Sequence, residues 1–374
     1  MKVKAAVLRE MGLPAPYAQS QPLKIETVEL APPGPGELLV RITAAGLCHS
    51  DLSVIEGNRP RPMPMVLGHE ATGIVEGLGE HVHDFAIGDA VVFSFVPSCG
   101  HCAPCAEGRA ALCEPGAKAN GAGTLLSGGM RWSLSGSQPY HHLGVSGFAE
   151  ATVVSARSAV KIDRDLKPEI AALFGCAVMT GMGAVVNTAA VRPGQSVAVF
   201  GLGGVGLSAV LGAVAAGAYP IVAIDRVPEK LALATALGAS HTVLADANTV
   251  EAVREATHGG AQVTVETVGH EAVLVQAYQA TRRGGLTVTA GLPHPSKMFS
   301  IPAVSLVAEE RTVKGSYMGS AVPQRDIPRY IALHRAGRLP VEKLLTNTLR
   351  LDEINAGFDR LARGEAVRQV VLFD

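Results

Sequence analysis

Aromatic residues are scarce in this sequence, and neither sign of charge is in large excess. Only 4% of its 374 residues are aromatic, so a buried core has to be built mainly from Val, Leu, Ile and Ala. The 32 basic and 33 acidic residues nearly cancel, whereas a protein that works mainly by binding nucleic-acid phosphates usually carries a basic excess. Charged residues make up 17% and hydrophobic residues 48%, which excludes wholesale disorder. At ~150 residues per domain, the length predicts two or three domains.

We expect no secretory signal at the N-terminus, because MKVKAAVLRE is too charged for one. Two stretches without any charge, residues 170–191 and 193–224, are longer than the ~20 residues of a membrane-spanning helix. Gly and Pro interrupt both of them, so we interpret them as the buried core of an α/β fold. We therefore expect a cytoplasmic protein with reduced thiols that has neither a membrane nor a nucleic acid as its partner.

The secondary-structure pattern changes along the chain. The first 100 residues show β-type alternation and dense Pro/Gly turns, and residues 97–147 form a Cys-rich, then Gly/Ser-rich excursion with little periodicity. From about residue 195, short apolar strands alternate with helix-length segments, which predicts βαβ units and a parallel sheet. The strand candidates are 197–200, 221–225, 241–244, 262–266 and 286–291, and the helix candidates are 228–237, 270–281 and, near the C-terminus, 352–364.

A glycine-rich turn follows the first of these strands. Gly201, Gly203 and Gly206 match G-x-G-x-x-G between the strand VAVF and an Ala/Leu-rich helix, where backbone N–H groups can bind a pyrophosphate. Asp225 ends the next strand, 19 residues after Gly206, where a carboxylate meets the adenosine ribose. This context favours a dinucleotide site over a packing turn. Asp225 would repel a 2′-phosphate and thus favours NAD over NADP, although Arg226 weakens that preference.

Four of the six cysteines lie within 15 residues. Cys99, Cys102, Cys105 and Cys113 follow the spacing C-x2-C-x2-C-x7-C, which suits a tetrahedral site of four thiolates. The bacterial iron–sulfur pattern has three residues before its last Cys and Pro after it, so zinc is the better interpretation. Disulfides are the alternative, and the expected compartment argues against them. All four ligands are thiols, which indicates a closed, structural site.

The other two cysteines lie far apart. Cys48 is in GLCHSD and Cys176 is in FGCAVMTG, and between them GHEATG contains His69 followed by Glu70. Two thiolates and one imidazole would leave a fourth zinc position open for substrate, as in a catalytic site. Taken singly, each cysteine is also compatible with a small buried hydrophobic residue.

The sequence resembles the zinc-dependent medium-chain alcohol dehydrogenases, close to their liver-type and class III branch. The matching motifs span nearly the whole chain: GLCHSD (46–51), GHEATG (68–73), the four-Cys lobe (99–113), GCAVMTG (175–181), GLGGVG (201–206), VETVG (265–269), KGSYMGS (314–320) and GEAVRQVVLF (364–373). The resemblance implies a GroES-like β-rich catalytic domain (1–178 and 320–374, with the zinc lobe at 97–115) and a Rossmann domain (179–319), a doubly wound parallel sheet that binds NAD. It also implies two zinc ions per chain and a homodimer or homotetramer.

By this resemblance, Cys48, His69 and Cys176 hold the catalytic zinc, with Glu70 as a transient ligand or only a salt-bridge partner. Asp51 is expected to bind the far nitrogen of His69, and Ser50 to take the substrate proton. Ser53 stands where many relatives carry the outer histidine of the proton relay, so water or His49 has to complete it. The positions that match cofactor contacts are His49, Thr180, Gly201, Gly203, Gly204, Val205, Gly206, Asp225, Lys230, Val268 and Arg368. His49 is alternatively an exposed loop residue.

The expected reaction is reversible hydride transfer between a primary aliphatic or aryl alcohol, or its aldehyde, and NAD. The class III alternative, S-(hydroxymethyl)glutathione, is weakened because Glu114 follows Cys113 and the first cation is Lys118. Apolar residues of the segment 120–143, among them Leu125 and Trp132, are expected to line a pocket or to pack on a partner subunit. A zinc-free quinone-reductase-like protein would lack the ligand cysteines, and a zinc-ribbon binding module would lack GLGGVG and GHE.

Overall fold

In a computed structural model that describes residues 1–373, the chain divides into two compact units. Unit 1 contains Met1–Cys176, Val322–Arg329 and the chain from Leu345 onward, and unit 2 contains Ala177–Ala321 and Tyr330–Leu344. The boundaries inferred from the sequence assign 320–374 to the first domain, whereas residues 330–344 group with unit 2. The physical reason is that the turn Val341–Leu344, with Val341 and Leu344 buried, packs on the first helix after the glycine-rich turn of unit 2.

Unit 2 is built on a six-stranded sheet in which every pair of neighbouring strands is parallel. Its strands are β11 (Val197–Phe200), β12 (Ile221–Asp225), β13 (His241–Leu244), β14 (Ala261–Glu266), β15 (Thr281–Thr289) and β16 (Thr312–Gly315). Their order across the sheet is β13-β12-β11-β14-β15-β16, the 3-2-1-4-5-6 order of the Rossmann fold. The order reverses beside β11, so the carboxyl end of β11 is the place where such sheets bind ligands.

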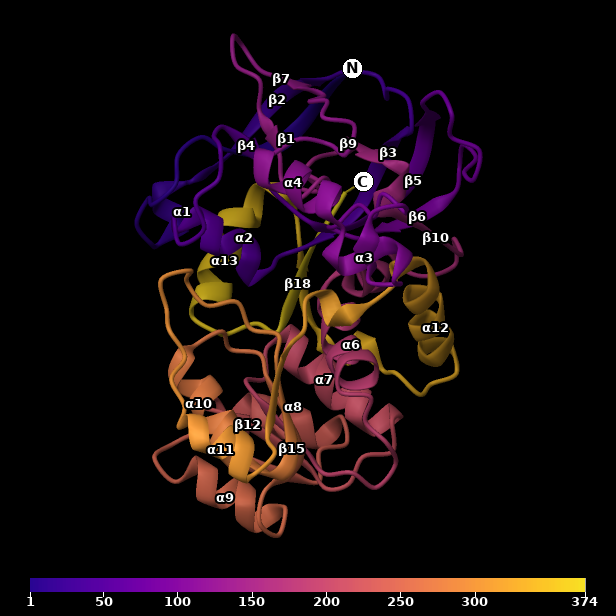
Figure 1. Ribbon diagram of the computed structural model, residues 1–374. Helices are drawn as coiled ribbons and strands as arrows, with labels where there is room; N and C mark the ends of the chain where they lie inside the picture. Colours follow the sequence, from indigo (N-terminus) through magenta and orange to yellow (C-terminus); the bar gives the residue numbers. More distant parts are fainter. Residues whose placement is uncertain (374) are drawn as a thin grey trace. The chain divides into compact units, whose positions relative to one another are not determined.

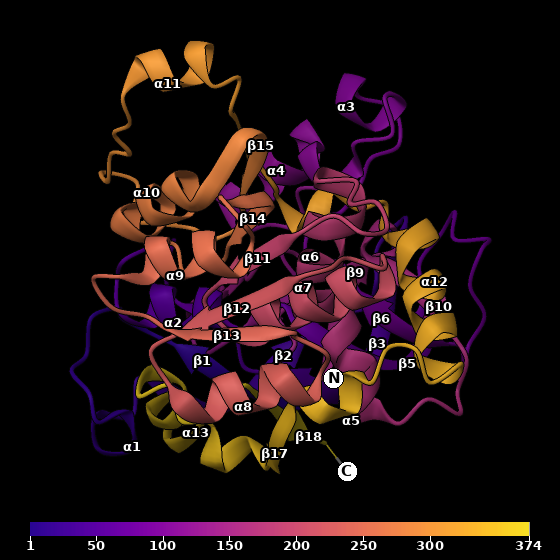
Figure 2. The ribbon, with the colours of Figure 1, turned by 90° about the horizontal axis from the view of Figure 1, so that it is seen from below.

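Helices cover both faces of this sheet. They are α6 (Ala177–Gly183), α7 (Gly204–Ala215), α8 (Pro228–Ala236), α9 (Thr249–Ala256) and α10 (Glu271–Ala280); α11 (Ala303–Ala308) also belongs to this unit but has no buried residue. Side chains of α9 and α10, including Val253 and Ala277, share a buried cluster with Phe200 and Ile224. Figure 2 shows α9 and α10 on one side of the strands and α7 on the other. Because apolar strands are buried on both faces here, they are continuous apolar runs, as in VAVF.

Unit 1 is built mainly from antiparallel strands. One sheet has the order β7-β2-β1-β4-β8, and the other has the order β10-β6-β5-β3-β18-β17 with β9 paired to β3. The strands are β1 (Lys2–Leu8), β2 (Leu23–Leu30), β3 (Glu37–Gly46), β4 (Met65–Val66), β5 (Glu70–Leu78), β6 (Ala90–Phe93), β7 (Trp132–Ser133), β8 (Tyr140–His141), β9 (Ala151–Ser155), β10 (Ala159–Ile162), β17 (Leu345–Leu349) and β18 (Arg368–Leu372). Figure 1 shows the C-terminal strand β18, in yellow, among the strands of this unit. Its pairing with β3 brings Arg368 to the same sheet as Glu70, although the two residues are nearly a whole chain apart.

Short helices connect the strands of unit 1. They are α1 (Tyr17–Ser20), α2 (His49–Ile55), α3 (Ala103–Ala106), α4 (Glu114–Ala122), α5 (Pro168–Ala171) and α13 (Ile354–Ala362); α12 (Pro323–Arg335) contains the unit boundary. The segment 97–147 holds α3 and α4 where we expected little regular structure. The helix α4 has Pro115 in its first turn, and Sγ of Cys113 accepts a hydrogen bond from Gly116 N–H at 3.4 Å. The cap therefore comes from a cysteine, which ordinary capping patterns do not include.

Within residues 1–373, no single helix is long and apolar enough to cross a bilayer. One bent pair of helices, Pro168–Gly175 and Ala177–Thr188, meets the length and composition criteria only when the two are taken together.

Candidate active site

Four potential metal ligands converge in unit 1. Cys48 precedes α2, His69 and Glu70 lie at the start of β5, and Cys176 follows a short helical turn after α5. Their side chains are all buried, and their ligand atoms lie within 4.8 Å of one another. Nε2 of His69 is 3.5 Å from Sγ of Cys176. The sequence places these residues far apart, and the fold brings together the donor set that zinc prefers.

The electrostatics of this cluster suit a cation. A hydrogen bond from the Cys176 thiol, with the charge of His69, holds the pKa of Cys48 well below its usual range despite burial. The hydrogen bond to Cys48, together with burial, raises the pKa of Cys176. The pKa values of these two buried thiols are therefore shifted in opposite directions by their mutual hydrogen bond. A divalent ion would take two thiolates at once, and ligand thiols are deprotonated when they bind metal.

A buried carboxylate lies behind the imidazole. Oδ2 of Asp51 is 3.0 Å from Nδ1 of His69, as expected from the resemblance, and Oδ1 accepts a hydrogen bond from Gly68 N–H at 3.1 Å. Burial opposes the charge on His69, but the Asp51 carboxylate and the Cys48 thiolate outweigh it and raise the pKa of His69. In the described structure Oδ2 lies off the direction of the His69 N–H bond, so this contact has the distance but not the alignment of a hydrogen bond.

His142 is a neighbour of Asp51 that the sequence analysis missed. Its Nδ1 lies 3.1 Å from Oδ1 of Asp51, and its ring meets the His69 ring edge-on at 5.6 Å between centroids. Burial lowers the pKa of His142 in spite of the carboxylate. The pair HH in YHHLGVSG was the only signal in the sequence, and it does not show which histidine faces the site.

Glu70 and Arg368 form a buried ion pair. Nη2 of Arg368 donates to Oε1 of Glu70, and both side chains are almost completely buried. Burial raises the pKa of Glu70 to about 7, although the guanidinium opposes this shift. The structure thus brings Arg368 to Glu70, a contact that its predicted role at the cofactor did not include. The salt-bridge alternative for Glu70 is present in the structure, and its oxygen also remains within the ligand cluster.

The predicted proton-transfer residues begin the helix α2. His49 is exposed, Ser50 is half-buried, and Asp51 is buried on the same short helix. The hydroxyl of Ser53 donates to the carbonyl oxygen of His49 at 2.8 Å. This bond occupies the only proton of the Ser53 hydroxyl, so Ser53 does not lengthen the relay in this arrangement.

The four-cysteine lobe is also assembled. The ligand atoms of Cys99, Cys102, Cys105 and Cys113 lie within 4.8 Å of one another. Backbone N–H groups point at the sulfurs: Cys99 N–H donates to Cys113 Sγ at 3.2 Å, and Cys102 N–H donates to Cys99 Sγ at 3.3 Å. Backbone hydrogen bonds from His101 and Cys102 lower the pKa of Cys99 to about 6. N–H groups aimed at sulfur stabilise thiolates, so the lobe fits a metal held by four thiolates.

The glycine-rich turn of unit 2 joins β11 to α7. Gly201 has φ +88°, in the left-handed region, and α7 begins at Gly204. A Cβ on Gly206 would lie 1.8 Å from the carbonyl oxygen of Gly201, so only glycine allows the helix to pack so close to the turn. A Cβ on Gly203 would meet no atom within 4 Å, so that position is open on the outer side of the turn. This open backbone at a helix N-terminus is where a pyrophosphate can approach.

Asp225 is fixed at the end of β12. Its two carboxylate oxygens accept hydrogen bonds from Leu202 N–H at 2.6 Å and from Val227 N–H at 3.0 Å. The first bond ties the carboxylate to the glycine-rich turn itself. Asp225 is thus held next to the glycine-rich turn.

Four further predicted cofactor residues also lie in unit 2, whereas His49 and Arg368 lie in unit 1. Thr180 is buried on α6, whereas Val205 and Lys230 are half-buried on α7 and α8. Val268 is 52% exposed, and its Cγ2 would lie 2.5 Å from a Cβ on Gly201. The structure thus brings Val268 to the turn, as it does Asp225.

A buried glutamate that the sequence analysis missed supports the same end of the sheet. Oε1 of Glu266 accepts hydrogen bonds from Val268 N–H at 2.7 Å and Gly269 N–H at 2.6 Å, and Oε2 accepts one from the Thr289 hydroxyl at 2.8 Å. Glu266 therefore shapes the loop that carries Val268. Its signal was a charged residue at the end of the apolar strand in VETVG.

Comparisons with known proteins agree with this architecture. Residues 34–164 match the alcohol dehydrogenase GroES-like domain, and residues 204–335 match the zinc-binding dehydrogenase family. The chain is 39% identical to an NDMA-dependent alcohol dehydrogenase of Amycolatopsis methanolica, covering 100% of this chain and 99% of the relative. It is 38% identical to geraniol dehydrogenase of Castellaniella defragrans, covering 100% and 98%. The crystal structure of benzyl alcohol dehydrogenase from Acinetobacter calcoaceticus superimposes with a TM-score of 0.93 at 30% identity, covering 100% of both chains.

The predicted GroES-like domain and Rossmann-type sheet are confirmed, as is the expectation of an oxidoreductase that uses zinc and a nicotinamide cofactor. The class III branch is not specifically supported by these relatives. With its matching domains and relatives over the full length, the chain belongs to the zinc-dependent medium-chain alcohol dehydrogenases.

Proposed function

We propose that Cys48, His69 and Cys176 hold a catalytic zinc ion and that the protein interconverts primary alcohols and aldehydes with NAD. The observation that carries this proposal is the convergence of two buried thiols and a buried imidazole, in a chain that also has the glycine-rich turn of a dinucleotide site. When bound, zinc supplies Lewis-acid polarisation of an alcohol or carbonyl oxygen. Glu70, which pairs with Arg368, lies in the same ligand cluster and would serve as a transient ligand of that ion.

Ser50 takes the proton of the alcohol. Its half-buried place on α2, between the exposed His49 and the buried Asp51, supports this role. A bound nicotinamide would supply the acceptor for the hydride that leaves the alcohol carbon as the carbonyl forms. Because the Ser53 hydroxyl is bonded to the His49 carbonyl, water or the His49 ring carries the proton onward.

The lobe formed by Cys99, Cys102, Cys105 and Cys113 holds a second, structural zinc ion. Four sulfurs with converging N–H donors leave no position for a substrate, which is the character of a closed site. Two zinc ions per chain are therefore expected. The six cysteines are free thiols arranged as metal ligands, which supports a cytoplasmic location.

NAD is the proposed cofactor. The Asp225 carboxylate is anchored by two backbone N–H groups and cannot easily turn away from an added 2′-phosphate. Arg226 is exposed and is the nearest cation in the sequence that could offset this repulsion. His49, Thr180, Lys230 and Arg368 remain predicted contacts of this cofactor.

The proposed substrates are primary aliphatic or aryl alcohols. Relatives named for geraniol and benzyl alcohol support an apolar substrate. Leu125 and Trp132, which we expected to line a pocket or pack on a partner, are instead fully buried in a core cluster of unit 1. Lys118 is exposed on α4, and Glu114 follows the last lobe cysteine, so the glutathione adduct is the weaker candidate.

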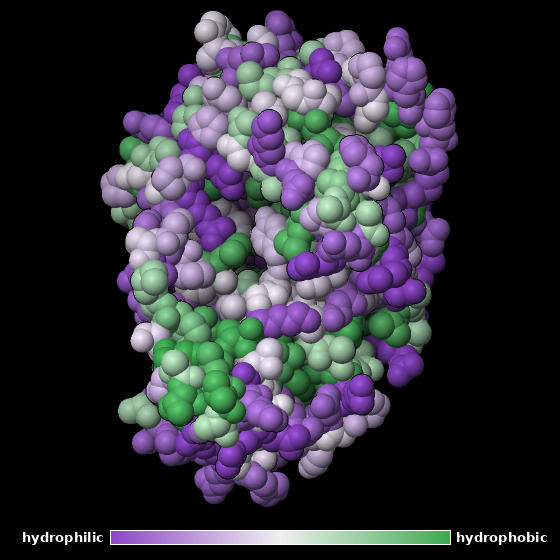
Figure 3. Space-filling view, in the orientation of Figure 1, coloured by the Kyte–Doolittle hydropathy of each residue, from purple (hydrophilic) through white to green (hydrophobic). Residues whose placement is uncertain are grey.

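A homodimer or homotetramer is proposed to form through unit 2. Among the described residues, β16 pairs only with β15 and leaves one strand edge open. Figure 3 shows apolar residues gathered over the region of α10 and α11, and the exposed ones include Met298, Val304 and Val307. Exposed apolar patches of this kind mark contact surfaces between proteins.

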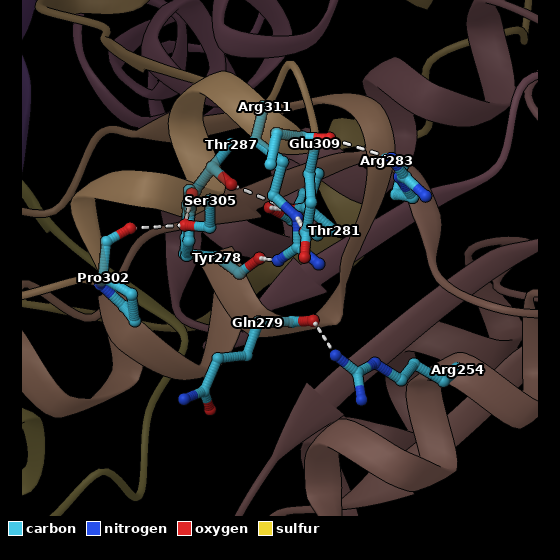
Figure 4. Close-up of polar contacts among 12 residues, drawn as sticks. Arg254, Tyr278, Gln279, Thr281, Arg283, Thr287, Pro302, Ser305, Glu309 and Arg311 are labelled. Carbon is cyan, nitrogen blue, oxygen red and sulfur yellow. Dashed lines mark hydrogen bonds and ion pairs between the residues drawn. The ribbon is translucent and has the colours of Figure 1, made fainter.

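The segment that carries this patch is firmly anchored. Figure 4 shows Tyr278 at the centre of the polar contacts, with its hydroxyl 2.5 Å from that of Ser305 and its carbonyl oxygen accepting from Arg311 at 2.7 Å. Glu309 pairs with Arg311 at 2.6 Å. A rigid patch loses less entropy on association than a mobile one. The variant Val307→Asp is expected to shift the mass measured by light scattering towards the monomer.

The decisive experiment is an alcohol panel with NAD+ in which the absorbance of NADH is followed. Aliphatic, allylic and benzylic primary alcohols are compared with the formaldehyde–glutathione adduct, and NADP+ replaces NAD+ in a parallel series. Because one relative is named as NDMA-dependent, a further series offers NDMA as acceptor without added NAD+. Cys48→Ser is the control. Full activity of that variant, or a wild-type protein without zinc at this cluster, would show that the proposal is wrong.

A further inference from the structure

His142 is a buried histidine with no assigned role. It lies in the loop after β8, its side chain is almost completely buried, and its Nδ1 is 3.1 Å from Oδ1 of Asp51. The other oxygen of the same carboxylate is 3.0 Å from Nδ1 of His69. One buried carboxylate thus lies between two imidazole rings, of which only His69 belongs to the ligand cluster.

We propose that His142 is a positioning residue for the catalytic zinc site, acting through Asp51 on the orientation of His69. This inference rests on the proposed zinc site at Cys48, His69 and Cys176. A carboxylate can turn about its Cβ–Cγ bond, and such a turn would move Oδ2 away from His69. The N–H group of Gly68 donates a hydrogen bond to Oδ1, and Nδ1 of His142 lies 3.1 Å from the same oxygen without the alignment of a hydrogen bond. With Oδ1 enclosed by these two groups, the other oxygen faces the His69 ring.

The position of His142 is itself fixed by its loop. The hydroxyl oxygen of Ser146 accepts a hydrogen bond from the N–H group of His142 at 2.9 Å, and the carbonyl oxygen of His142 accepts bonds from Val145 and Ser146. Leu143 and Ser146 have φ of +50° and +53°, in the left-handed region that ordinary residues seldom adopt. The hydroxyl of Thr152 in β9 donates to Val145 and ties the loop to the sheet. A loop closed in this way presents one side chain in one place.

The His69 ring is also enclosed. The ring of Phe95 meets it edge-on at 5.3 Å between centroids, and the ring of His142 does so at 5.6 Å. Phe95 is held in turn by Asn120 of α4, whose Nδ2 donates to the Phe95 carbonyl oxygen at 2.7 Å. Two aromatic edges restrict rotation of the imidazole, and only the His142 edge also contacts the carboxylate behind it. A ligand imidazole has to aim its nitrogen lone pair at the metal, so partners that fix ring orientation support metal affinity and activity.

The test compares three variants of the two adjacent, buried histidines. His142→Phe keeps the ring and its edge contact but removes the N–H group, whereas His142→Asn keeps a donor of similar reach. His141→Phe is the matched control, because His141 is equally buried but contacts Trp132 and the N–H group of Arg131 instead of Asp51. Each is purified as the full chain, and thermal unfolding confirms folding.

The principal readouts are the absorption bands of protein loaded with cobalt(II) and the rate at which a chelator removes the metal from the two-cysteine site. We expect His142→Phe to weaken metal retention and to lower kcat by about 10–100-fold, the usual effect of losing an outer partner of a metal ligand, with KM for NAD+ unchanged. We expect His142→Asn to recover most of this loss. His141→Phe should lower the unfolding temperature without changing the cobalt spectrum.

A double-mutant cycle with Asp51→Asn separates this role from packing. If His142 acts through Asp51, His142→Phe adds no further loss of metal retention once Asp51 is Asn. Additive losses in the cycle, or a cobalt spectrum that His141→Phe changes as much as His142→Phe does, would overturn the proposal. A third metal ion per chain at Asp51, His69 and His142 would also overturn it. Failure of the wild-type protein to bind metal at Cys48, His69 and Cys176 would instead reject the proposed function.

Discussion

Nδ1 of His69 lies 3.0 Å from an oxygen of Asp51, while Nε2 of the same ring lies 3.5 Å from Sγ of Cys176. The imidazole therefore bridges a buried carboxylate and a buried thiol. A ring with a carboxylate at Nδ1 keeps its proton there and leaves Nε2 as the lone-pair donor. In the described structure the Asp51 carboxylate lies at Nδ1 without the alignment of a hydrogen bond, and Nε2 is the nitrogen that faces the ligand cluster.

Replacing Asp51 by Asn should weaken the metal site without removing a ligand. The amide has the size of the carboxylate but no charge, so it makes His69 a poorer electron donor. We expect metal affinity or kcat to fall by about 10–100-fold, as when other metal-binding histidines lose the group that contacts their second ring nitrogen. Metal content after dialysis against a chelator measures this.

Asp359→Asn is the control for that experiment. Asp359 is a buried carboxylate that accepts hydrogen bonds from the N–H groups of Tyr17 and Ala18, at 2.6 and 2.8 Å. This control should lower stability and leave the metal in place. Equal metal loss in both variants would contradict a specific role of Asp51.

Loss of a lobe cysteine should affect stability more than chemistry. We expect Cys105→Ser to bind one zinc ion in place of two and to unfold at a lower temperature, because the lobe loses the ion that joins its four sulfurs. Each kcal/mol lost would lower Tm by roughly 2–4 °C for a domain of about 200 residues. Elemental analysis and calorimetry measure the two effects. Cys176→Ser is the counterpart: it should lose activity while the lobe keeps its zinc.

Two glycines of the same turn should respond differently to alanine. In Gly206→Ala the added methyl group would meet the Gly201 carbonyl oxygen at 1.8 Å, so the turn has to move and stability should fall. Gly203→Ala has free space within the protein and a φ of −75°, so the fold should tolerate it. Its methyl group would instead occupy the space that the pyrophosphate needs. Titration with NADH should therefore show weaker binding for Gly203→Ala at an unchanged Tm, and unchanged binding would argue against a dinucleotide at this turn.

Asp225→Ser should relax the preference for NAD. Removing the carboxylate removes its repulsion of a 2′-phosphate, and the exposed Arg226 stays available to attract that phosphate. We expect the ratio of kcat/KM values for NADP+ and NAD+ to rise by about tenfold, equivalent to ~1.4 kcal/mol. A ratio that stays constant would mean that Asp225 acts on the turn, through its bond to Leu202, rather than on the ribose.

Acid should destabilise unit 1 through His141. Burial, with the charge of Arg131, lowers its pKa from 6.5 to about 3. Its two ring nitrogens each lie 3.2 Å from an N–H group, of Trp132 and of Arg131, and a protonated ring can accept from neither. Below pH 6.5 the unfolded chain binds a proton that the folded chain does not, so stability falls as the pH falls towards 3. The free energy of unfolding should drop by up to ~1.4 kcal/mol per pH unit for this one group.

His141→Gln tests this pH dependence. The Gln amide oxygen still accepts a hydrogen bond but does not titrate in this range. The free energy of unfolding is measured with denaturant between pH 4 and 8. Its slope against pH should be shallower for the variant than for the wild-type protein, by the equivalent of one proton below pH 6.5. Identical slopes would mean that other groups cause the acid sensitivity.

Much of the architecture follows from local patterns. The strands at 197–200, 221–225 and 241–244 have the predicted bounds. For the first two, an apolar run between turn residues defines a buried strand by itself, whereas residues 241–244 are mostly exposed. The helix α4 was missed because its Gly and Asn residues are poor helix formers and its cap is Cys113. Residues 330–344 belong to unit 2 because their last turn packs on α7. A local sequence pattern does not contain such a packing contact.

The four-cysteine lobe and the glycine-rich turn could be predicted from the sequence, since their parts lie within a few residues of one another and chain geometry restricts where they can go. Only the tertiary structure decided the partners of the catalytic cluster. It brings His142 next to Asp51, although about a quarter of the chain separates them. It also brings Arg368 next to Glu70, although most of the chain separates these two. Such pairs leave no periodic signal, because strand pairing and loop closure, rather than spacing along the chain, bring a buried charge to its partner.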